Sequence, residues 1–467
     1  MNTAIHWFRR DLRISDNTSL SAASREASNV IPVYVLSAWK ESHRWTGANR
    51  QHFLCGCLAS LEKNLQTLDG RLVIRQGDAV EELEKLVDET RADTIFYNRD
   101  PDPFGRETER RLAVMAARRG IALRDFKDVC VHERDEVLTG QGEPFRVFTP
   151  YSRAWAKLPR PSVSPRPKSL STPPAIPSLP LPTLDFWGLS GPAPGMEEPG
   201  EKAARRRLAA FLPDGLSNYS TQRNIPAGKT TSRLSQDLRF GLLSIREVLE
   251  AVEKCAAELP AAGRESAAKY VAELVWREFY IQVLWHFPEV LEQEFSPKFR
   301  GMRWPGKTAH FERWKAGMTG FPIVDAAMRE LNETGFMHNR TRMIAAMFLT
   351  KDLHLDWRLG ESYFMQKLTD GEIASNNGGW QWSAGTGADA APYFRIQNPW
   401  TQTQRFDPDG IYIKKWVPEL RDAAPEIFSE PPASGLSLAK GYPPPIVDHA
   451  KARDITLDLF AAHKESR

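Results

Sequence analysis

Short apolar runs alternate with amphipathic stretches over the first 130 residues of the chain. Four runs have the length and the β-branched or aromatic content of buried strands: 5–8, 30–36, 71–76 and 94–97. Apolar residues recur every three or four positions in three other segments, which predicts helices over 50–68, 79–90 and 105–120. This alternation favours an α/β domain with a doubly wound parallel sheet over residues 1–130. Ligands of such sheets bind beyond the carboxyl ends of the strands.

The pattern changes to helical spacing alone after about residue 200. Apolar positions three and four apart predict an all-α domain over residues 200–467, with helices over 203–212, 244–259, 269–287, 322–333 and 340–353. Residues 131–199 connect the two domains, and twelve prolines fall within 159–199. Because proline fixes φ and lacks an N–H group, we expect an extended connector that lies along a surface.

The bulk composition excludes several classes of protein without selecting one. No apolar run approaches the roughly 20 residues that a membrane-spanning helix needs, and the first residues lack the pattern of a secretory signal. The four cysteines have no metal-ligand spacing, so we expect reduced thiols, no metal and a cytoplasmic protein. The 62 basic and 59 acidic residues nearly balance, which neither requires nor excludes nucleic acid.

Aromatic and polar residues gather in the helical half, where nine of the 14 tryptophans fall between residues 276 and 416. Residues 230–235, TTSRLS, place hydroxyl groups and an arginine before a helical stretch, as a phosphate site or an ordinary helix N-cap would. Asp370 lies in a glycine-punctuated segment, and Arg342 is its expected partner. A structural ion pair is the simpler explanation of these two residues.

Two further segments carry polar residues on helices. Glu273 and Trp276 are three residues apart, so they share one helical face, and a carboxylate on an aromatic face is unusual for a core helix. Asn339 and Arg340 are side chains of the kind that contact base edges and phosphates, although a solvated helix start accounts for them as well.

Six blocks of sequence, in this order, resemble the photolyase/cryptochrome family. They are WFRRDLR (7–13), TSRLS (231–235), WREFY (276–280), TGFMHNRTRM (334–343), DGEIASNNGGWQW (370–382) and TGADAAPYFRIQNP (386–399). Their order and spacing are similar to the family along nearly the whole chain, with the nearest resemblance to class I photolyases that repair cyclobutane pyrimidine dimers. The resemblance implies an N-terminal α/β domain and a helical domain that binds FAD, as the hydrophobic pattern also indicates.

The resemblance assigns a set of residues to FAD. Six residues match the family's ligands of the phosphates and the ribityl chain: Tyr219, Thr231, Ser232, Arg233, Leu234 and Ser235. Other matched positions are Arg277, Arg342, Asp370, Gly371, Glu372 and Asn376, with Asn376 expected at flavin N5. Groups near flavin N1 and N5 tune its electronic properties.

The implied reaction is light-driven repair of UV-damaged DNA. Excited FAD in its reduced, anionic form gives an electron to a dimer flipped out of duplex DNA, the cyclobutane ring splits, and the electron returns. The implied catalytic residues are Glu273, Trp276, Asn339, Met343, Asn376 and Trp382. Four of these, Glu273, Trp276, Asn339 and Trp382, are also expected to contact DNA together with Arg340, Arg395 and Gln402. Members that repair (6-4) photoproducts have histidines where this chain has Asn339 and Met343, which favours cyclobutane dimers.

Electron supply and light harvesting are also implied by matched positions. Trp304, Trp357 and Trp380 match the family's electron-transfer tryptophans, by which oxidised flavin is reduced from the surface. Arg50, Asp100 and Asp102 resemble an antenna site for a deazaflavin or a flavin. Residues 104–106, FGR, lack the acidic residue of the folate pattern, so a folate is disfavoured.

Two alternative functions stay open at this point. A cryptochrome-type blue-light photoreceptor would share most of these positions. A flavoprotein without photochemistry would leave the combination of Glu273, Trp276 and Trp382 unexplained. For the repair function a monomer is sufficient, and no membrane is involved. We expect the protein in the cytoplasm, and at the nucleoid when it is bound to damaged DNA.

Overall fold

The computed structural model describes residues 2–39, 43–189, 191, 194–228 and 230–465. Its N-terminal part is built on a five-stranded sheet in which every strand pair is parallel, with the strand order β3-β2-β1-β4-β5. The strands are β1 (Thr3–Phe8), β2 (Asn29–Leu36), β3 (Val73–Gln76), β4 (Thr94–Asn98) and β5 (Ala122–Phe126). The predicted α/β class is confirmed, although the sequence pattern gave only the first four strands. β5 was missed because this edge strand is largely exposed and has no apolar run.

Four helices accompany the sheet: α1 (Thr18–Glu26), α2 (Ala48–Gln66), α3 (Ala79–Thr90) and α4 (Pro103–Arg119). Alternate residues of β1 enter different cores, because successive side chains of a strand point to opposite faces. Ile5 and Trp7 join the cluster that includes residues of α3 and α4, whereas Ala4 and Phe8 join the large cluster shared with the helical part. Both faces are therefore buried, as is usual for a parallel sheet.

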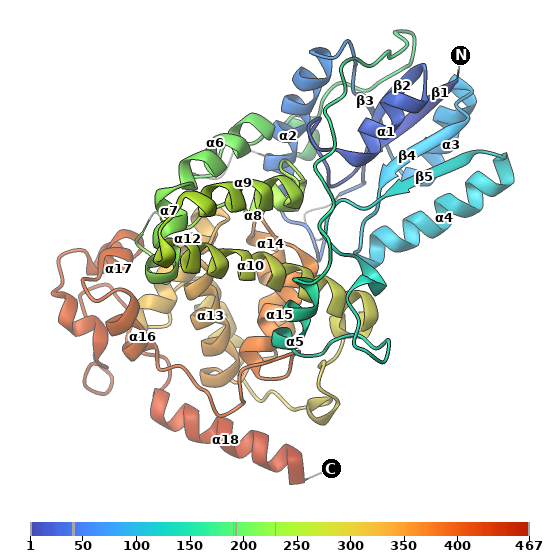
Figure 1. Ribbon diagram of the computed structural model, residues 1–467. Helices are drawn as coiled ribbons and strands as arrows, with labels where there is room; N and C mark the ends of the chain where they lie inside the picture. Colours follow the sequence, from blue (N-terminus) through green and yellow to red (C-terminus); the bar gives the residue numbers. More distant parts are fainter. Residues whose placement is uncertain (1, 40–42, 190, 192–193, 229, 466–467) are drawn as a thin grey trace.

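The connector is extended and returns across the α/β part before the helical part begins (Figure 1). It contains one α-helix, α5 (Phe148–Trp155), and two 3-10 turns, Arg134–Glu136 and Asp185–Trp187. Its backbone is fastened to the sheet region: Ser171 O accepts from Val30 N at 2.9 Å, and Leu179 N donates to Ile74 O at 3.0 Å. The expected surface-lying connector is what the structure has.

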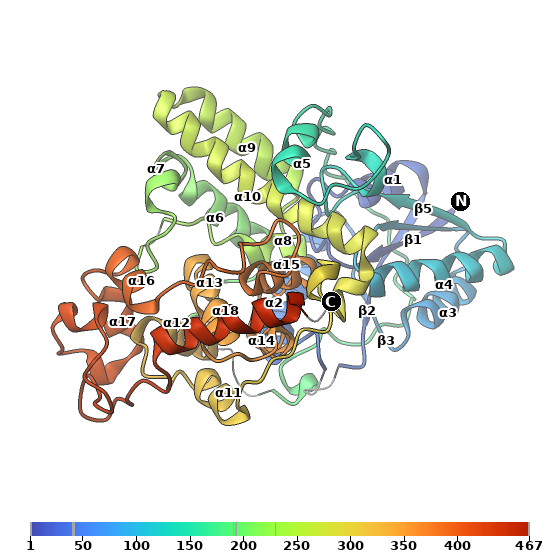
Figure 2. The same cartoon turned by 90° about the horizontal axis from the view of Figure 1, so that it is seen from below.

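The remainder is helical. Its α-helices are α6 (Glu201–Phe211), α7 (Asp214–Gln222), α8 (Ser235–Phe240), α9 (Ile245–Glu258), α10 (Ala261–His286), α11 (Thr308–Lys315), α12 (Pro322–Thr334), α13 (Asn339–Met347), α14 (Trp357–Lys367), α15 (Ile373–Ala384), α16 (Pro399–Phe406), α17 (Ile411–Trp416) and α18 (His449–Glu465). α10 packs against α5, α7, α9 and α15, and α18 lies across one face of the helical part (Figure 2). None of the helices in the described ranges combines the length and the hydropathy that crossing a membrane requires.

Four buried charges join the two parts. Arg13 donates to Asp128 at 2.5 Å, and Arg246 of α9 donates to Asp128 at 2.8 Å and to Asp16 at 3.0 Å. Burial alone would raise the pKa of Asp128, but Arg13 and Arg246 lower it below its ordinary value. Desolvating charges is costly, so the arrangement is stable only because each charge has partners.

We predict that Asp128→Ala destabilises the protein by about 3–5 kcal/mol, since it leaves two buried arginines without their shared carboxylate. Urea denaturation measures the change, and Glu107→Ala, which removes an exposed pair with Arg110, is the control that leaves the midpoint unchanged. Because the folded-state pKa of Asp128 is depressed, its contribution is present above the unfolded-state pKa and is lost as pH falls through the folded-state pKa. An Asp128→Ala midpoint equal to that of the wild type would contradict this prediction.

Candidate functional site

The segment NNGGWQW lies in α15, and its two glycines differ in their surroundings. A Cβ at Gly378 would overlap the ring of Tyr280 on α10, whereas a Cβ at Gly379 would meet nothing within 4 Å. Gly378 therefore permits close packing of two helices. Gly379 borders open space, on the same helical face as Asn376 three residues earlier.

Asn376 is fixed by α14. Its Nδ2 donates to the carbonyl oxygen of Glu361 at 3.0 Å, which leaves Oδ1 as the free acceptor. The neighbouring Asn377 donates to Glu361 Oε1 at 2.8 Å, so both asparagines depend on one residue of α14. Oδ1 can therefore accept a hydrogen bond from a bound group.

The expected ion pair between Asp370 and Arg342 is present. Arg342 Nη2 donates to Asp370 Oδ2 at 2.8 Å, while its Nε donates to Met337 O at 2.7 Å. Asp370 Oδ1 is buried and has no hydrogen-bond partner in the part of the chain that the structure describes. A buried carboxylate oxygen without a donor indicates a missing polar partner, as a bound cofactor would supply.

The hydroxyl-rich segment 230–235 ends at Ser235, the first residue of α8, and makes no side-chain cap hydrogen bond to this helix. The N-cap is Leu234, a buried residue that makes no side-chain cap hydrogen bond. Ser232 Oγ accepts instead from Tyr270 at 3.1 Å, and Tyr270 lies edge-on to buried Tyr219. Thr231 is half-buried and Ser235 is exposed, and neither is the N-cap residue of α8.

Arg233 has a left-handed backbone, with φ of 50°, which turns the chain into α8. Its guanidinium lies 3.8 Å over the ring of Phe336 and pairs with Glu197 at 2.6 Å. The Arg233 side chain is thus oriented by contacts with the connector and with the segment before α13.

Gly371 and Glu372 connect the expected flavin segment to the α/β part. Glu372 forms ion pairs with Arg10 and, at 3.0 Å, with Arg277. Although burial favours a raised pKa, Arg277, Arg10 and Arg239 lower the pKa of Glu372 to about 2. Arg277 also donates to Val129 O at 2.8 Å, so it faces the domain boundary.

The expected lesion-binding residues lie on three helices, α10, α13 and α15, of which α10 and α13 both pack against α15. Trp382 of α15 is half-buried, as are Trp276 and Glu273 of α10. Asn339 and Met343 lie one turn apart on α13, exposed and half-buried.

Two contacts of this group were not expected from the sequence. Phe148 of α5 stacks on Trp276 with ring centroids 3.8 Å apart and planes 7° apart, and Arg223 pairs with Glu273. Phe148 and Arg223 lie 128 and 50 positions from their partners, so no local pattern indicates either contact.

The expected DNA-binding residues lie on the segments beside this group. Arg340 donates to Asn224 at 2.8 Å and lies 4.5 Å over the ring of Phe406. Arg395 is exposed next to Phe394, which is 62% exposed, and Gln402 of α16 is half-buried. Exposed cations beside apolar surface suit a polyanion with flat bases.

The three expected electron-transfer tryptophans belong to or pack against one hydrophobic cluster that is rich in aromatic side chains. Trp380 and Trp357 are fully buried, and half-buried Trp304 packs against the same cluster. Trp380 points toward α14, where a Cβ at Gly360 would overlap its ring. Of the three, only Trp304 has exposed surface. Trp314, which was not expected, lies 6.1 Å from Trp380.

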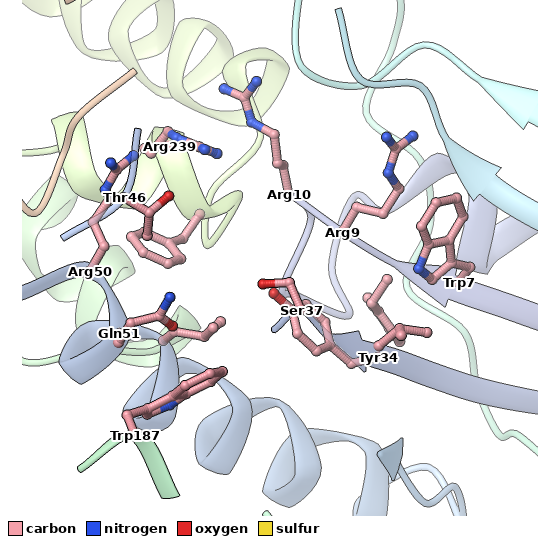
Figure 3. A pocket seen from close by; sticks show the side chains of 14 residues that line it. Trp7, Arg9, Arg10, Tyr34, Ser37, Thr46, Arg50, Gln51, Trp187 and Arg239 are labelled. Atoms are coloured by element: carbon pink, nitrogen blue, oxygen red, sulfur yellow. The ribbon is translucent and has the colours of Figure 1, made fainter. Parts of the chain in front are cut away.

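A second site is a pocket of about 260 Å³ between the α/β and helical parts (Figure 3). Of the three expected antenna residues, only Arg50 lines it. Asp100 and Asp102 instead hold Arg10, which does line the pocket, at 3.0 and 3.1 Å. The sequence did not indicate the other lining residues, which include Tyr34, Trp187 and Arg239. No cluster of metal-ligating side chains was found in the described residues.

Comparisons with known proteins give consistent matches. A family model described as DNA photolyase matches residues 4–173, and one described as the FAD binding domain of DNA photolyase matches residues 270–462. Deoxyribodipyrimidine photo-lyase of Agrobacterium fabrum is 39% identical over 99% of this chain and 98% of its own. The Escherichia coli enzyme of the same name is 38% identical over 100% of both chains.

Three solved structures have folds similar to that of this chain. A bacterial class III photolyase from Agrobacterium tumefaciens has a TM-score of 0.92 at 39% identity, covering 100% of this chain and 98% of its own. An archaeal photolyase from Sulfolobus tokodaii, described with two FAD molecules, has a TM-score of 0.86 at 29% identity, covering 98% and 100%. A Synechocystis cryptochrome has a TM-score of 0.90 at 28% identity, covering 98% and 99%.

The two adjacent glycines of α15 provide a matched pair of variants. Gly378→Ala should destabilise the apoprotein by about 1–3 kcal/mol, because the new methyl group overpacks against Tyr280. Gly379→Ala should leave the apoprotein as stable or raise its stability by up to about 1 kcal/mol, since alanine favours a helix. It should nevertheless weaken FAD binding, because its methyl group enters the open space. Urea denaturation and FAD titration measure both effects, and equal behaviour of the two variants would contradict the assignment.

Proposed function

The chain belongs to the photolyase/cryptochrome family, and from that premise we propose that it repairs cyclobutane pyrimidine dimers in duplex DNA. It is a light-driven DNA-repair lyase that binds FAD. The observation that carries the proposal is the near-complete coverage, at 38–39% identity, of relatives named deoxyribodipyrimidine photo-lyase.

The residues of the helical part fit FAD. A bound dinucleotide would supply a partner to the donor-free oxygen of Asp370 and could occupy the open space beside Gly379, and the hydroxyl groups of Thr231 and Ser235 are not used to cap α8. When bound and fully reduced, FAD supplies the light-excited electron donor. We propose that Asn376 Oδ1 accepts a hydrogen bond from the flavin, while Asp370 and Arg342 orient its ring and segment 230–235 binds its phosphates.

We propose that Trp276 and Trp382 form the walls against which the flipped dimer stacks. Phe148 supports this assignment because its parallel stack on Trp276 holds the indole in one orientation. Glu273 would accept hydrogen bonds from the pyrimidine edges, and Arg223 keeps its carboxylate in place. Damaged bases are the least costly to extrude from a duplex.

The residues on α13 favour cyclobutane dimers over (6-4) photoproducts. Asn339 and Met343 cannot donate a proton as histidine does. His338 is buried, its Nδ1 accepts from Arg340 N at 3.1 Å, and burial with the nearby Arg342 and Arg340 lowers its pKa to about 4. A histidine that is neutral at physiological pH and committed to capping α13 supplies no proton to the substrate.

We propose that Arg340, Arg395 and Gln402 contact DNA beside the proposed lesion-binding residues, so that binding weakens as salt rises. The division into an antenna domain (1–130), a connector (131–199) and a catalytic domain (200–467) is supported by the end of β5 at Phe126 and the start of α6 at Glu201.

We propose that the protein is a monomer. It would act in the cytoplasm and at the nucleoid, and it would need no membrane.

We propose that the inter-domain pocket holds a second chromophore, a deazaflavin or a flavin. The pocket lies at the carboxyl ends of β1 and β2, where ligands of parallel sheets bind. The relative from Sulfolobus tokodaii is described with two FAD molecules and a novel light-harvesting cofactor. A photoreceptor function remains the second candidate because a cryptochrome shares the fold, but its identity is lower, at 28%.

The central experiment illuminates chemically reduced protein with duplex DNA that contains cyclobutane dimers and follows the recovery of thymine absorbance. We expect light-dependent recovery with this DNA and none with DNA that contains only (6-4) photoproducts. Absence of recovery with both substrates would exclude repair and favour the photoreceptor candidate, whereas recovery with (6-4) DNA would overturn the substrate assignment.

Trp304→Phe should block light-driven reduction of the oxidised flavin, because it removes the half-buried end of the tryptophan cluster. The flavin's visible absorbance under illumination with an external reductant measures this. Repair by the pre-reduced variant should equal that of the wild type, and Trp400→Phe, a buried tryptophan beside Phe321, is the matched control. Loss of repair by the pre-reduced Trp304→Phe variant would contradict the assignment of Trp304 to electron transfer alone.

A further inference from the structure

One face of the Trp276 indole is covered by the protein itself. The Phe148 ring stacks on it with centroids 3.8 Å apart and planes 7° apart. Phe279 meets the indole edge-on at 5.6 Å, and Tyr280 lies tilted at 5.5 Å. An aromatic ring has two faces, so only the other face of this half-buried indole can stack on a base. Phe148 therefore determines which face Trp276 offers to a lesion.

Phe148 is the first residue of α5, and the opposite end of α5 is firmly held. The helix packs against α10 (Figure 2). Its last residue, Trp155, is buried, and the Trp155 Nε1 donates to Glu278 Oε2 at 2.7 Å. Glu278 also accepts from His132 N at 3.3 Å, so this buried carboxylate of α10 holds both α5 and the connector before it. Phe148 thus reaches Trp276 from a helix whose far end is fixed.

The Phe148 end of α5 is held by a residue from a distant segment. Val147, the N-cap residue, makes no side-chain cap hydrogen bond to the helix. Phe148 N donates instead to Asp389 Oδ2 at 3.2 Å, across 241 positions of sequence. A carboxylate at a helix N-terminus accepts from a free N–H group and complements the helix dipole. Asp389 therefore takes the place of a local cap.

Asp389 belongs to segment 386–399, which also carries Phe394 and Arg395. Phe394 is 62% exposed, and Arg395 is exposed beside it. The Asp389 backbone is left-handed, with φ of 48°, a conformation that aspartate tolerates better than most residues. The segment proposed to contact DNA is thereby joined, through Asp389 and α5, to the ring that stacks on Trp276.

We propose that α5 is a positioning element for lesion recognition, in which Phe148 fixes the orientation of Trp276 and Asp389 makes that orientation depend on segment 386–399. The inference rests on the proposed function, because it takes Trp276 as a wall of the lesion site. Both residues act through Trp276 and not by contact with the substrate. They control lesion discrimination and not general DNA affinity, since phosphate contacts supply the binding of undamaged DNA.

The test measures binding of FAD-loaded protein in the dark to two duplexes of one sequence, with and without a single cyclobutane dimer. Fluorescence anisotropy of a labelled duplex gives both dissociation constants, and their ratio is the lesion discrimination. Phe148→Leu keeps an apolar side chain without the flat ring, so the ratio should fall about three- to ten-fold, as loss of one aromatic pair produces. Phe148→Tyr keeps the ring and should retain the wild-type ratio. Phe311→Leu, which removes a ring stacked on Trp314 at 5.9 Å, is the matched control and should also retain it.

Asp389→Ala tests the link from an exposed position, where the substitution leaves the core intact. The loss of a negative charge should strengthen binding to both duplexes alike, whereas the loss of the cap should lower the discrimination ratio about two- to five-fold. The double variant with Phe148→Leu should discriminate no worse than Phe148→Leu alone, because both substitutions act on one path. Glu143→Ala, which removes an exposed carboxylate of the connector, is the control.

The pattern of ratios separates positioning from folding. An unchanged ratio in Phe148→Leu would overturn the role of Phe148, and tighter binding of dimer DNA would mean that this ring occupies the face that the lesion needs. Equal weakening of both duplexes, with loss of FAD or a lower urea midpoint, would reduce Phe148 to a structural role and overturn the proposal.

The link through α5 has its own outcomes. An unchanged ratio in Asp389→Ala, or effects of the two substitutions that simply add, would overturn it. Failure of the proposed function would appear separately, in the wild type, as equal affinity for the two duplexes or as no repair on illumination.

Discussion

Four charged side chains buried between the α/β and helical parts constrain the rest of the molecule. Arg13 and Asp16 follow β1, Asp128 follows β5, and Arg246 belongs to α9, so the network draws together three distant stretches of sequence. Charges removed from water are tolerated only with well-placed partners, so a displaced docking would leave at least one of them unpaired. The arrangement of the two parts is thereby specified, and both proposed chromophore sites depend on it.

The same boundary positions the segment that we propose to bind FAD. Glu372, the N-cap residue of α15, forms ion pairs with Arg10 of the α/β part and with Arg277 of α10. The helix that carries Asn376, Trp380 and Trp382 is therefore positioned from its first residue by contacts across the boundary. Close packing also positions α15. The absence of a side chain at Gly378 lets Tyr280 approach the backbone of α15, and its absence at Gly360 lets Trp380 approach the backbone of α14.

The sequence predicted those parts of the fold whose pattern is local. The helix over 79–90 has the bounds that periodicity gave, and strands β1 to β4 were found because they are apolar. α1 and β5 were missed because small, polar or exposed residues carry no apolar periodicity. At the candidate site, the pairing of Asp370 with Arg342 followed from their charges. The stack of Phe148 on Trp276 and the hydrogen bond from Phe148 N to Asp389 could not be predicted, since they exist only after distant segments have packed.

The spacing of the two tryptophans in α15 has an evolutionary consequence. Residues two apart on a helix point about 200° away from each other, so Trp380 faces α14 and the aromatic cluster while Trp382 belongs to a different surface. Natural selection can therefore alter one face of this helix without disturbing the neighbours of the other. If the proposed roles hold, a descendant could lose the lesion-binding face and keep the buried tryptophans, so that repair enzymes and light sensors would diverge at a single helix.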